Sequence, residues 1–471
     1  MAELELKKIL KNVLFVLGAQ LLVLIISMTR SLILPAFFSV ESYGYWQIYL
    51  FYSTYVGIFA FGFSDGIYLR YGDKDYNELP FAKLRASIRI FSFMLLVITI
   101  LIISLTYFFS VNDDLRFVLL FSAFNIFVLG LTGIFTYVLQ ITNQIKKYSF
   151  FSVADKVLVL ATVLLMFFVD NNNFKLIIVI DFIAKSLVVV AMIYLCKELW
   201  IGRNVSFSMA FKEFRNNIGA GLKLLIANLL GMLIVGMGRF LIQVFGEIED
   251  FATYSFGITI TGLVLTAITA FSLVLYPSIK RLDKNNYDKY FKNINSFINA
   301  FNFSALLLYF PAYLCVIYFY SKYADMLPYL NLLFIVAILQ AKMSILNNTF
   351  YKVLRKEKEM LIANLSSVLF FAILAPIVFY FTKSIWSIAF TTFATMMIRC
   401  YASEIYLKKL VHIQLDYKFV IEIVFIIVFI IATTLMNLKH GTFLYLIFLT
   451  IWISLNISEW KKIAQTLKIK L

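Results

Sequence analysis

The sequence predicts an all-α polytopic membrane protein with about fourteen transmembrane helices. Of its 471 residues, 62% are hydrophobic and only 14% are charged. A soluble domain of this length needs far more charged surface. Apolar runs of about 18 or more residues recur along the chain, and each is long enough to cross a hydrocarbon core as a helix. The ten-residue alternation of a membrane β-barrel is absent, so we expect a helical bundle.

The apolar runs give the expected positions of the helices. The first run follows Lys7, Lys8 and Lys11 and is too long for a signal-peptide core, so we interpret it as the first membrane helix. In chain order the predicted helices span residues 12–35, 44–64, 85–110, 115–141, 148–169, 174–197, 218–245, 251–277, 293–320, 327–350, 360–381, 384–410, 418–437 and 441–457.

The distribution of basic residues predicts which ends of these helices are cytoplasmic. With the N-terminus inside, the inner segments hold thirty Lys and Arg, whereas the outer loops hold five, namely Arg116, Lys175, Lys322, Lys383 and Lys439. A miscounted helix would scramble this bias. We therefore expect both termini to be cytoplasmic. The net charge of +16 then reports topology and contact with an anionic inner leaflet, and it does not indicate nucleic-acid binding.

The order of the helices indicates an internal duplication. The starts of the first six helices recur in the next six at an offset of about 210 residues, so both copies begin on the same side of the membrane. We expect an N-lobe at 1–197, an amphipathic cytoplasmic linker at 198–217, a C-lobe at 218–410, and two further helices with a basic tail at 411–471. Two lobes facing a central cavity, exposed alternately to each side, is an architecture typical of transporters.

Charged residues within the predicted helices are candidate functional residues, because each costs about 2.5–3.5 kcal/mol to insert unless it is paired or lines a wet cavity. The cations proposed to line a substrate cavity are Arg30, Lys185, Arg239, Lys342 and Arg399. Lys185 and Asp181 are four residues apart and are as well explained by mutual neutralisation. Lys223 and Glu422 lie near the inner ends of their helices, where we expect them to reach the surface.

Acids and amides within the helices provide a second group of candidates. A transport cycle driven by protons or sodium needs an acid whose occupancy changes, and the candidates are Asp155, Asp181 and Glu404. Asn295, Asn299 and Asn302 share one face of a helix. Such a stripe either joins helices or lines a wet cavity, and the sequence favours neither.

The N-terminal quarter resembles a known family. The stretches "RSLILPAFFSVESYGYWQIYLF" and "FGFSDGIYLRYG" are similar to the start of polysaccharide-transporter proteins, the flippases for O-antigen and capsule repeat units in the multidrug/oligosaccharidyl-lipid/polysaccharide exporter superfamily. The residues that carry the resemblance are Arg30, Pro35, Tyr43, Gly44, Phe61, Gly62, Asp65, Gly66, Arg70 and Gly72. The resemblance implies two six-helix lobes, a cationic cavity and a lipid-linked oligosaccharide as substrate. Glycines around Asp65 would allow tight backbone turns between moving parts.

The expected function is translocation of a polyprenyl-diphosphate-linked glycan across the bacterial cytoplasmic membrane, with membrane lipid and, as further partners, a glycan polymerase and a chain-length protein. Moving sugar hydroxyls and a diphosphate through hydrocarbon unaided is prohibitively costly. The alternatives are a cation-coupled small-molecule efflux antiporter and, less favoured, a membrane glycan polymerase or glycosyltransferase. The sequence contains no nucleotide-binding or metalloenzyme motif, and we expect no enzymatic activity, cofactor or metal.

The expected orientation can be tested by cysteine labelling. After the native Cys196, Cys315 and Cys400 are replaced, a cysteine at Glu249 should react with an impermeant thiol reagent in intact cells, because the loop there is predicted to be external. A cysteine at Asn286 should stay unlabelled. The reverse pattern would overturn the orientation.

Overall fold

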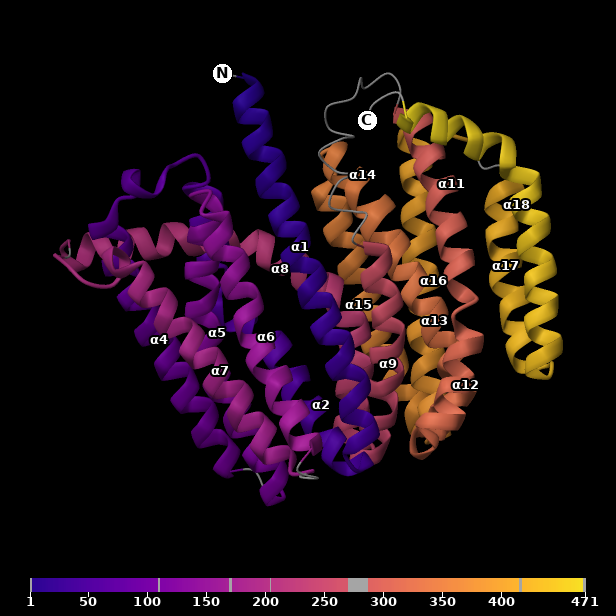
Figure 1. Cartoon of the computed structure of the whole chain (residues 1–471), viewed down its shortest axis with the longest axis horizontal. Helices are drawn as coiled ribbons and strands as arrows, with labels where there is room; N and C mark the ends of the chain where they lie inside the picture. The colour runs from indigo at the N-terminus through magenta and orange to yellow at the C-terminus, as the bar shows by residue number, and fades with distance from the viewer. Residues whose placement is uncertain are drawn as a thin grey trace. The chain divides into compact units, whose positions relative to one another are not determined.

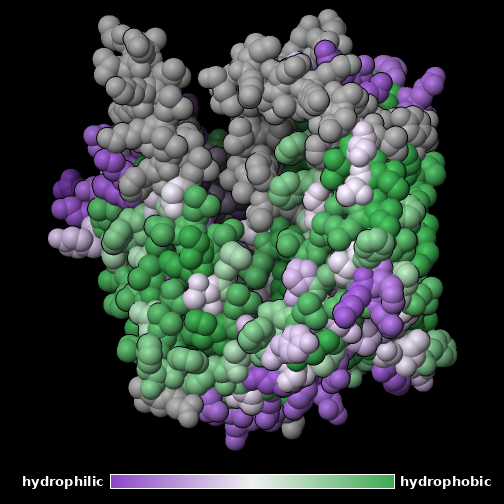
Figure 2. Space-filling view, turned by 45° about the vertical axis from the view of Figure 1, so that its right-hand side comes forward, coloured by the Kyte–Doolittle hydropathy of each residue, from purple (hydrophilic) through white to green (hydrophobic). Residues whose placement is uncertain are grey.

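The structure, a computed structural model, describes residues 2–108, 111–168, 172–203, 205–269, 287–414 and 417–468. All regular elements in these ranges are helical, and nine helices among them are long and apolar enough to span a membrane, followed by shorter apolar helices at 419–434 and 438–454. The all-α polytopic prediction is confirmed. On the face drawn in Figure 2, apolar side chains cover most of the visible helical surface.

The chain divides into two compact units, Met1–Leu229 and Leu230–Leu471. The first unit contains α1 (Ala2–Phe37), α2 (Val40–Tyr55), α3 (Phe63–Arg70), α4 (Phe81–Phe108), α5 (Asp113–Ile141), α6 (Ile145–Phe168), α7 (Phe174–Leu195) and the first part of α8 (Phe207–Phe245). Its central helix is α5, which packs against α2, α3, α4 and α7, while α1 packs against α6.

The second unit contains the rest of α8 and the helices up to the C-terminal end of the description (Figure 1). These are α9 (Ile248–Thr269), α11 (Tyr287–Leu306), α12 (Tyr309–Phe319), α13 (Leu327–Lys342), α14 (Asn348–Val353), α15 (Glu357–Thr382), α16 (Ile385–Leu410), α17 (Tyr417–Thr434) and α18 (Leu438–Lys468). Its central helix is α13, which packs against α9, α11, α16 and α17. Almost every side chain of α13 is buried, as expected for a helix that is apolar on all sides.

The packing pattern of the first unit recurs in the second. In the first unit α5, the fourth predicted helix, contacts the second, third and sixth predicted helices (α2, α4 and α7). In the second unit α13, the tenth predicted helix, contacts the eighth, ninth and twelfth (α9, α11 and α16). The fifth and sixth helices, α6 and α7, pack together, and so do their counterparts α15 and α16. Equivalent helices thus make equivalent contacts, as an internal duplication requires.

Several predicted helices have boundaries or breaks that the sequence reading missed. The expected helix at 293–320 is divided into α11 and α12, because Pro311 has no N–H to donate to the carbonyl of Leu307. The expected helix at 327–350 contains a π-helical turn at Met343–Asn347. The last residues of three predicted helices, 109–110, 169 and 270–277, lie outside the described residues.

The predicted continuous helix at 44–64 is wrong. Helix α2 ends at Tyr55 and is followed by a 3₁₀ turn at Val56–Ala60. Phe61 and Gly62 then adopt left-handed conformations with φ of +47° and +78° before α3 begins. Glycine adopts such angles without steric cost. The expectation of a glycine-dependent backbone turn next to Asp65 therefore holds at Gly62.

Gly66 has a different role from Gly62, because it lies within α3 where that helix meets α8. A Cβ at Gly66 would overlap the carbonyl of Asn217, and a Cβ at Gly221 would overlap that of Gly62. Further along, Arg70 forms an ion pair of 2.5 Å with Glu213. The residues meet in steps of four along both helices, in opposite chain directions. The two backbones therefore touch along a glycine face, a form of packing typical of membrane helices.

Charged residues after α3 bind to the chain segment before α8. The Tyr76 hydroxyl donates to Glu198 at 2.9 Å, and the Arg85 guanidinium donates to the backbone carbonyls of Glu198 and Arg203. Part of the expected linker, 207–217, is helical and continuous with the rest of α8. The dense charge after α3 thus holds the loop at 70–78 against the start of α8.

The contact between α3 and α8 predicts a sharp difference between two neighbouring glycines of α8. Gly221→Ala should destabilise the protein by about 1–3 kcal/mol, since overpacked contacts cost that much. Gly219→Ala is the matched control, because a Cβ there meets nothing within 4 Å, and alanine favours a helix by about 0.5–1 kcal/mol. Thermal unfolding in detergent measures both. Equal effects of the two substitutions would contradict the contact.

Candidate functional site

The strongest concentration of buried charge lies in the second unit, around Lys342. This lysine is the last residue of α13 and is only 2% exposed. Directly after it the chain makes the π-helical turn Met343–Asn347, and the Asn347 amide donates to the carbonyl of Cys400 on α16 at 3.0 Å. Such turns often occur at functional sites, because the extra residue reorients the neighbouring side chains.

Two carboxylates neutralise Lys342. Its ammonium group lies 2.7 Å from a carboxylate oxygen of Glu404 on α16 and is also paired with Glu422 on α17. Glu404 in turn pairs with Lys408 at 2.8 Å. All four residues are at most 4% exposed. Two lysines and two glutamates give a network with no net charge, which is what a low-dielectric interior requires.

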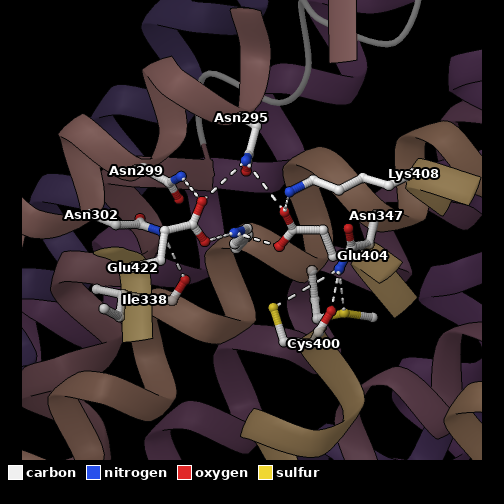
Figure 3. Close-up of polar contacts among 11 residues, drawn as sticks. Asn295, Asn299, Asn302, Ile338, Asn347, Cys400, Glu404, Lys408 and Glu422 are labelled. Atoms are coloured by element: carbon white, nitrogen blue, oxygen red, sulfur yellow. Dashed lines mark hydrogen bonds and ion pairs between the residues drawn. The ribbon is translucent and has the colours of Figure 1, made fainter. Parts of the chain in front are cut away.

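The asparagine stripe of α11 completes this network. Asn295 donates to Glu404 at 3.3 Å and to Glu422 at 3.1 Å, and Asn299 also donates to Glu422. Asn302 donates to the carbonyl of Ile338 at 3.1 Å. Figure 3 shows these amides together with the two carboxylates and Lys408. Of the two interpretations left open, this conformation has the stripe joining helices α11, α13 and α17.

The expected surface position of Glu422 is wrong. The carboxylate is 3% exposed and holds α17 to α13 through Lys342. Lys408, which the charge count placed among inner-segment cations, is 4% exposed. Distance from the helix end did not predict either position, because the partners that make burial tolerable come from other helices.

The first unit contains a smaller buried pair. Lys185 pairs with Asp181 one turn earlier on α7, and the Tyr49 hydroxyl of α2 donates to the same carboxylate at 2.7 Å. Asp181 and its partner Lys185 thus have the i,i+4 contact that their spacing suggested. Asp155 pairs with its neighbour Lys156 at 3.1 Å, and both side chains are partly exposed.

The three arginines of the candidate set have different surroundings. The Arg30 guanidinium lies 5.6 Å from the centre of the Trp46 ring, a distance at which cation–π attraction operates. Arg239 lies on α8 and donates to the carbonyl of Ser255 at 3.4 Å. Arg399, on α16, is 2% exposed and donates to the amide oxygen of Asn364 at 2.7 and 3.0 Å. The five candidate cations thus fall into two paired lysines and three arginines with other surroundings.

The residues of the family-like motif mostly serve packing. Pro35 lies near the end of α1, and Tyr43 and Gly44 are buried in α2. Asp65 is 8% exposed and accepts a hydrogen bond of 3.2 Å from the Tyr137 hydroxyl of α5. Together with the contacts of Gly62, Gly66 and Arg70, these positions fix α2 and α3 within the first unit.

Sequence reasoning missed several members of these clusters, which share polar character within an apolar helix. They are Tyr49, Asn217, Gln340, Asn347, Asn364 and Lys408. The polar residues among them in long apolar runs were visible in the sequence. Their partners were not, since each partner belongs to another helix.

Comparisons with known proteins place this fold. No family model and no curated protein matches the chain. Among solved structures, it is similar to lipid II flippase MurJ in an inward closed conformation, with a TM-score of 0.62 and 15% identity over 94% of this chain and 100% of that one. It is also similar to the MATE transporter VcmN of Vibrio cholerae, with a TM-score of 0.53 and 14% identity over 86% and 97%.

A third match is an inward-facing multidrug resistance MATE family transporter of the MOP superfamily, with a TM-score of 0.52 and 13% identity over 83% of this chain and 94% of that one. Identities this low establish the fold alone. The chain therefore has the multi-pass fold that these transporters of the MOP superfamily share.

The ion-pair network predicts a rescue experiment. Lys342→Met should destabilise the protein by about 3–5 kcal/mol, because it leaves buried negative charge without compensation. Adding Glu422→Gln should recover most of this loss, since Glu404 keeps Lys408 and the network is neutral again. The midpoint of thermal unfolding in detergent measures the effect.

The exposed Lys358 of α15 provides the matched control, and Lys358→Met should change the midpoint little. If the double variant were as unstable as Lys342→Met alone, charge balance would not be what holds α17 in place.

Proposed function

We propose that the protein is a flippase that carries a polyprenyl-diphosphate-linked oligosaccharide across the bacterial cytoplasmic membrane by alternating access, for the synthesis of a surface glycan. The observation that carries the proposal is the likeness in fold, over nearly the whole chain, to a flippase named for a lipid-linked substrate. The resemblance of the N-terminal quarter to polysaccharide transporters supports the same class of substrate.

Physical chemistry supports a carrier with internal cations. A diphosphate and many sugar hydroxyls lose tens of kcal/mol of hydration in hydrocarbon. Fixed positive charges in a wet cavity can replace that hydration while the polyprenyl tail stays in lipid, and no covalent bond changes. In this proposal the head group is held by cations of the candidate set.

The contacts rank these cations. Lys185 and Lys342 already have carboxylate partners, so they have less charge to offer a diphosphate in this conformation. Arg30 is partly buried, and its guanidinium lies against Trp46. We therefore propose Arg30 as a contact to the head group in the first unit. Asp155, Asp181 and Glu404 remain proposals for coupling to an ion.

The second candidate function is efflux of small organic cations, and the likeness in fold to MATE transporters favours it. Such a substrate needs unpaired carboxylates. The most deeply buried acids of the candidate set, Asp181 and Glu404, are paired with lysines, which argues for the flippase.

Deleting the gene tests the proposal. Lipid-linked glycan should accumulate on the cytoplasmic face, and the wild-type gene should restore surface glycan. Arg30→Ala should restore less than about a tenth of it, whereas Arg30→Lys should restore a substantial part, since a diphosphate can be held by a point charge. Lys83→Ala, which removes an exposed lysine of α4, is the control and should restore it fully.

Protein levels in the membrane are measured for each variant, so that a loss of function is separated from a loss of protein. Unchanged surface glycan in the deletion strain, together with new sensitivity to organic cations, would replace the flippase by the efflux antiporter.

A further inference from the structure

Arg399 is the buried cation for which the described residues supply no acidic partner. The positive charges of Lys185, Lys342 and Lys408 each meet a carboxylate. The described hydrogen bonds of the Arg399 guanidinium go instead to amide oxygens, from Asn364 at 2.7 and 3.0 Å and from Gln340 at 3.5 Å. Amide oxygens orient a guanidinium, but they carry no net charge to neutralise it.

Such a group is costly unless an anion completes it. Removing an ion from water costs several kcal/mol after protein relaxation, and a neutral hydrogen-bond acceptor recovers only part of that. Arg399 is 2% exposed, so bulk water does not surround it. The two amides fix the planar fork in one orientation, which is the arrangement that favours bidentate recognition of a phosphate.

A cleft of about 300 Å³ lies beside Arg399, between α15 and α16 and next to α14. Hydroxyl groups line it, from Tyr351, Ser366, Ser367, Ser403 and Tyr406. Hydroxyls and a guanidinium together offer several donors to one anionic group. The acid in the lining, Glu359, is paired with Lys356 at 3.3 Å, so its charge is already met.

The position of the cleft along the helices suits a lipid head group. It extends from Glu359, in the first turn of α15, to Arg399, which lies eleven residues before the end of α16 at Leu410. That separation is about 16 Å along the helix axis. Exposed apolar residues, Ile362 and Ile398, also line it, as expected where acyl chains approach. The predicted topology places these helix ends on the cytoplasmic side.

We propose that this cleft is a binding site for a phosphate or diphosphate group, with Arg399 as its fixed cation. The group can be borne by an inner-leaflet lipid or be free in solution, and the chemistry of recognition is the same. The site belongs to the second unit alone and does not depend on the proposed flippase activity. If the bound lipid is the polyprenyl diphosphate, the cleft is in addition a substrate site.

Binding is tested on the purified, delipidated full chain by the midpoint of thermal unfolding and by native mass spectrometry. The probes are inorganic pyrophosphate, phosphatidylglycerol and a polyprenyl diphosphate, and zwitterionic phosphatidylcholine is the comparison. At saturation, at least one phosphate probe should raise the midpoint by about 5 °C more than phosphatidylcholine does. A shift with pyrophosphate shows that the group alone suffices, and a shift with the lipids only shows that a lipid carries it.

Variants separate binding from a purely structural role. Arg399→Gln should reduce apparent affinity at least tenfold. Without any probe its midpoint should equal or exceed that of the wild type, because an uncompensated charge has been removed. Arg399→Lys should retain part of the shift. Ser366→Phe fills the exposed mouth of the cleft without changing Arg399 and should abolish the shift, whereas Lys358→Gln, an exposed charge on the same helix, should not.

The proposal is overturned if no probe shifts the midpoint, or if Arg399→Gln or Ser366→Phe binds as the wild type does. A lower midpoint for Arg399→Gln with unchanged binding would assign Arg399 to holding α13, α15 and α16 together. Failure here and failure of the flippase proposal are distinguishable, since the latter is read from glycan export and the former from binding to the purified chain.

Discussion

The cost of an unneutralised charge in a low-dielectric interior governs this structure more than any other constraint. Around Lys342 the cost is offset by two glutamates, a second lysine and two asparagine amides, contributed by four helices. Because removing one member leaves another buried without compensation, the network makes the positions of these helices mutually dependent. Its member on α17, Glu422, ties that helix to the core of the second unit. Buried charge here acts as a device of assembly.

Close backbone packing supplies what hydrophobicity cannot supply inside a membrane. Lipid is as apolar as leucine, so helices gain little by burying leucine against one another, and small residues that let backbones approach gain more. Gly62 and Gly66 of α3 meet Asn217 and Gly221 of α8 in this way. The pair of Arg70 with Glu213 then fixes which turn of one helix faces which turn of the other. A motif that resembles a family signature thus has a mechanical explanation in the first unit.

Duplication explains why both units have a central helix, and divergence explains why only one has a charged centre. Helices α5 and α13 occupy equivalent places in the packing, yet α13 ends in Lys342 and a π-helical turn, whereas α5 contains no charge after its first turn. The charged centre of the second unit needs Glu422, which lies on one of two helices beyond the duplicated set. Added helices are therefore part of the interior of that unit, and the fold shared with MurJ and MATE transporters sets the frame that they join.

Composition and the spacing of apolar runs determined the helical class, the number of helices and the duplication, because the hydrocarbon thickness and the need to satisfy every backbone amide leave few alternatives. They also marked Lys342, Glu404 and the α11 asparagines as unusual, since a polar group in an apolar run stands out along the chain. Only the tertiary structure decided which of these groups meet. It buried Glu422 and Lys408, paired Lys185 with Asp181, and left Arg399 with amide partners beside a hydroxyl-lined cleft. Ion pairs and close helix contacts join residues more than a hundred positions apart, and no local pattern in a single sequence specifies such a partner.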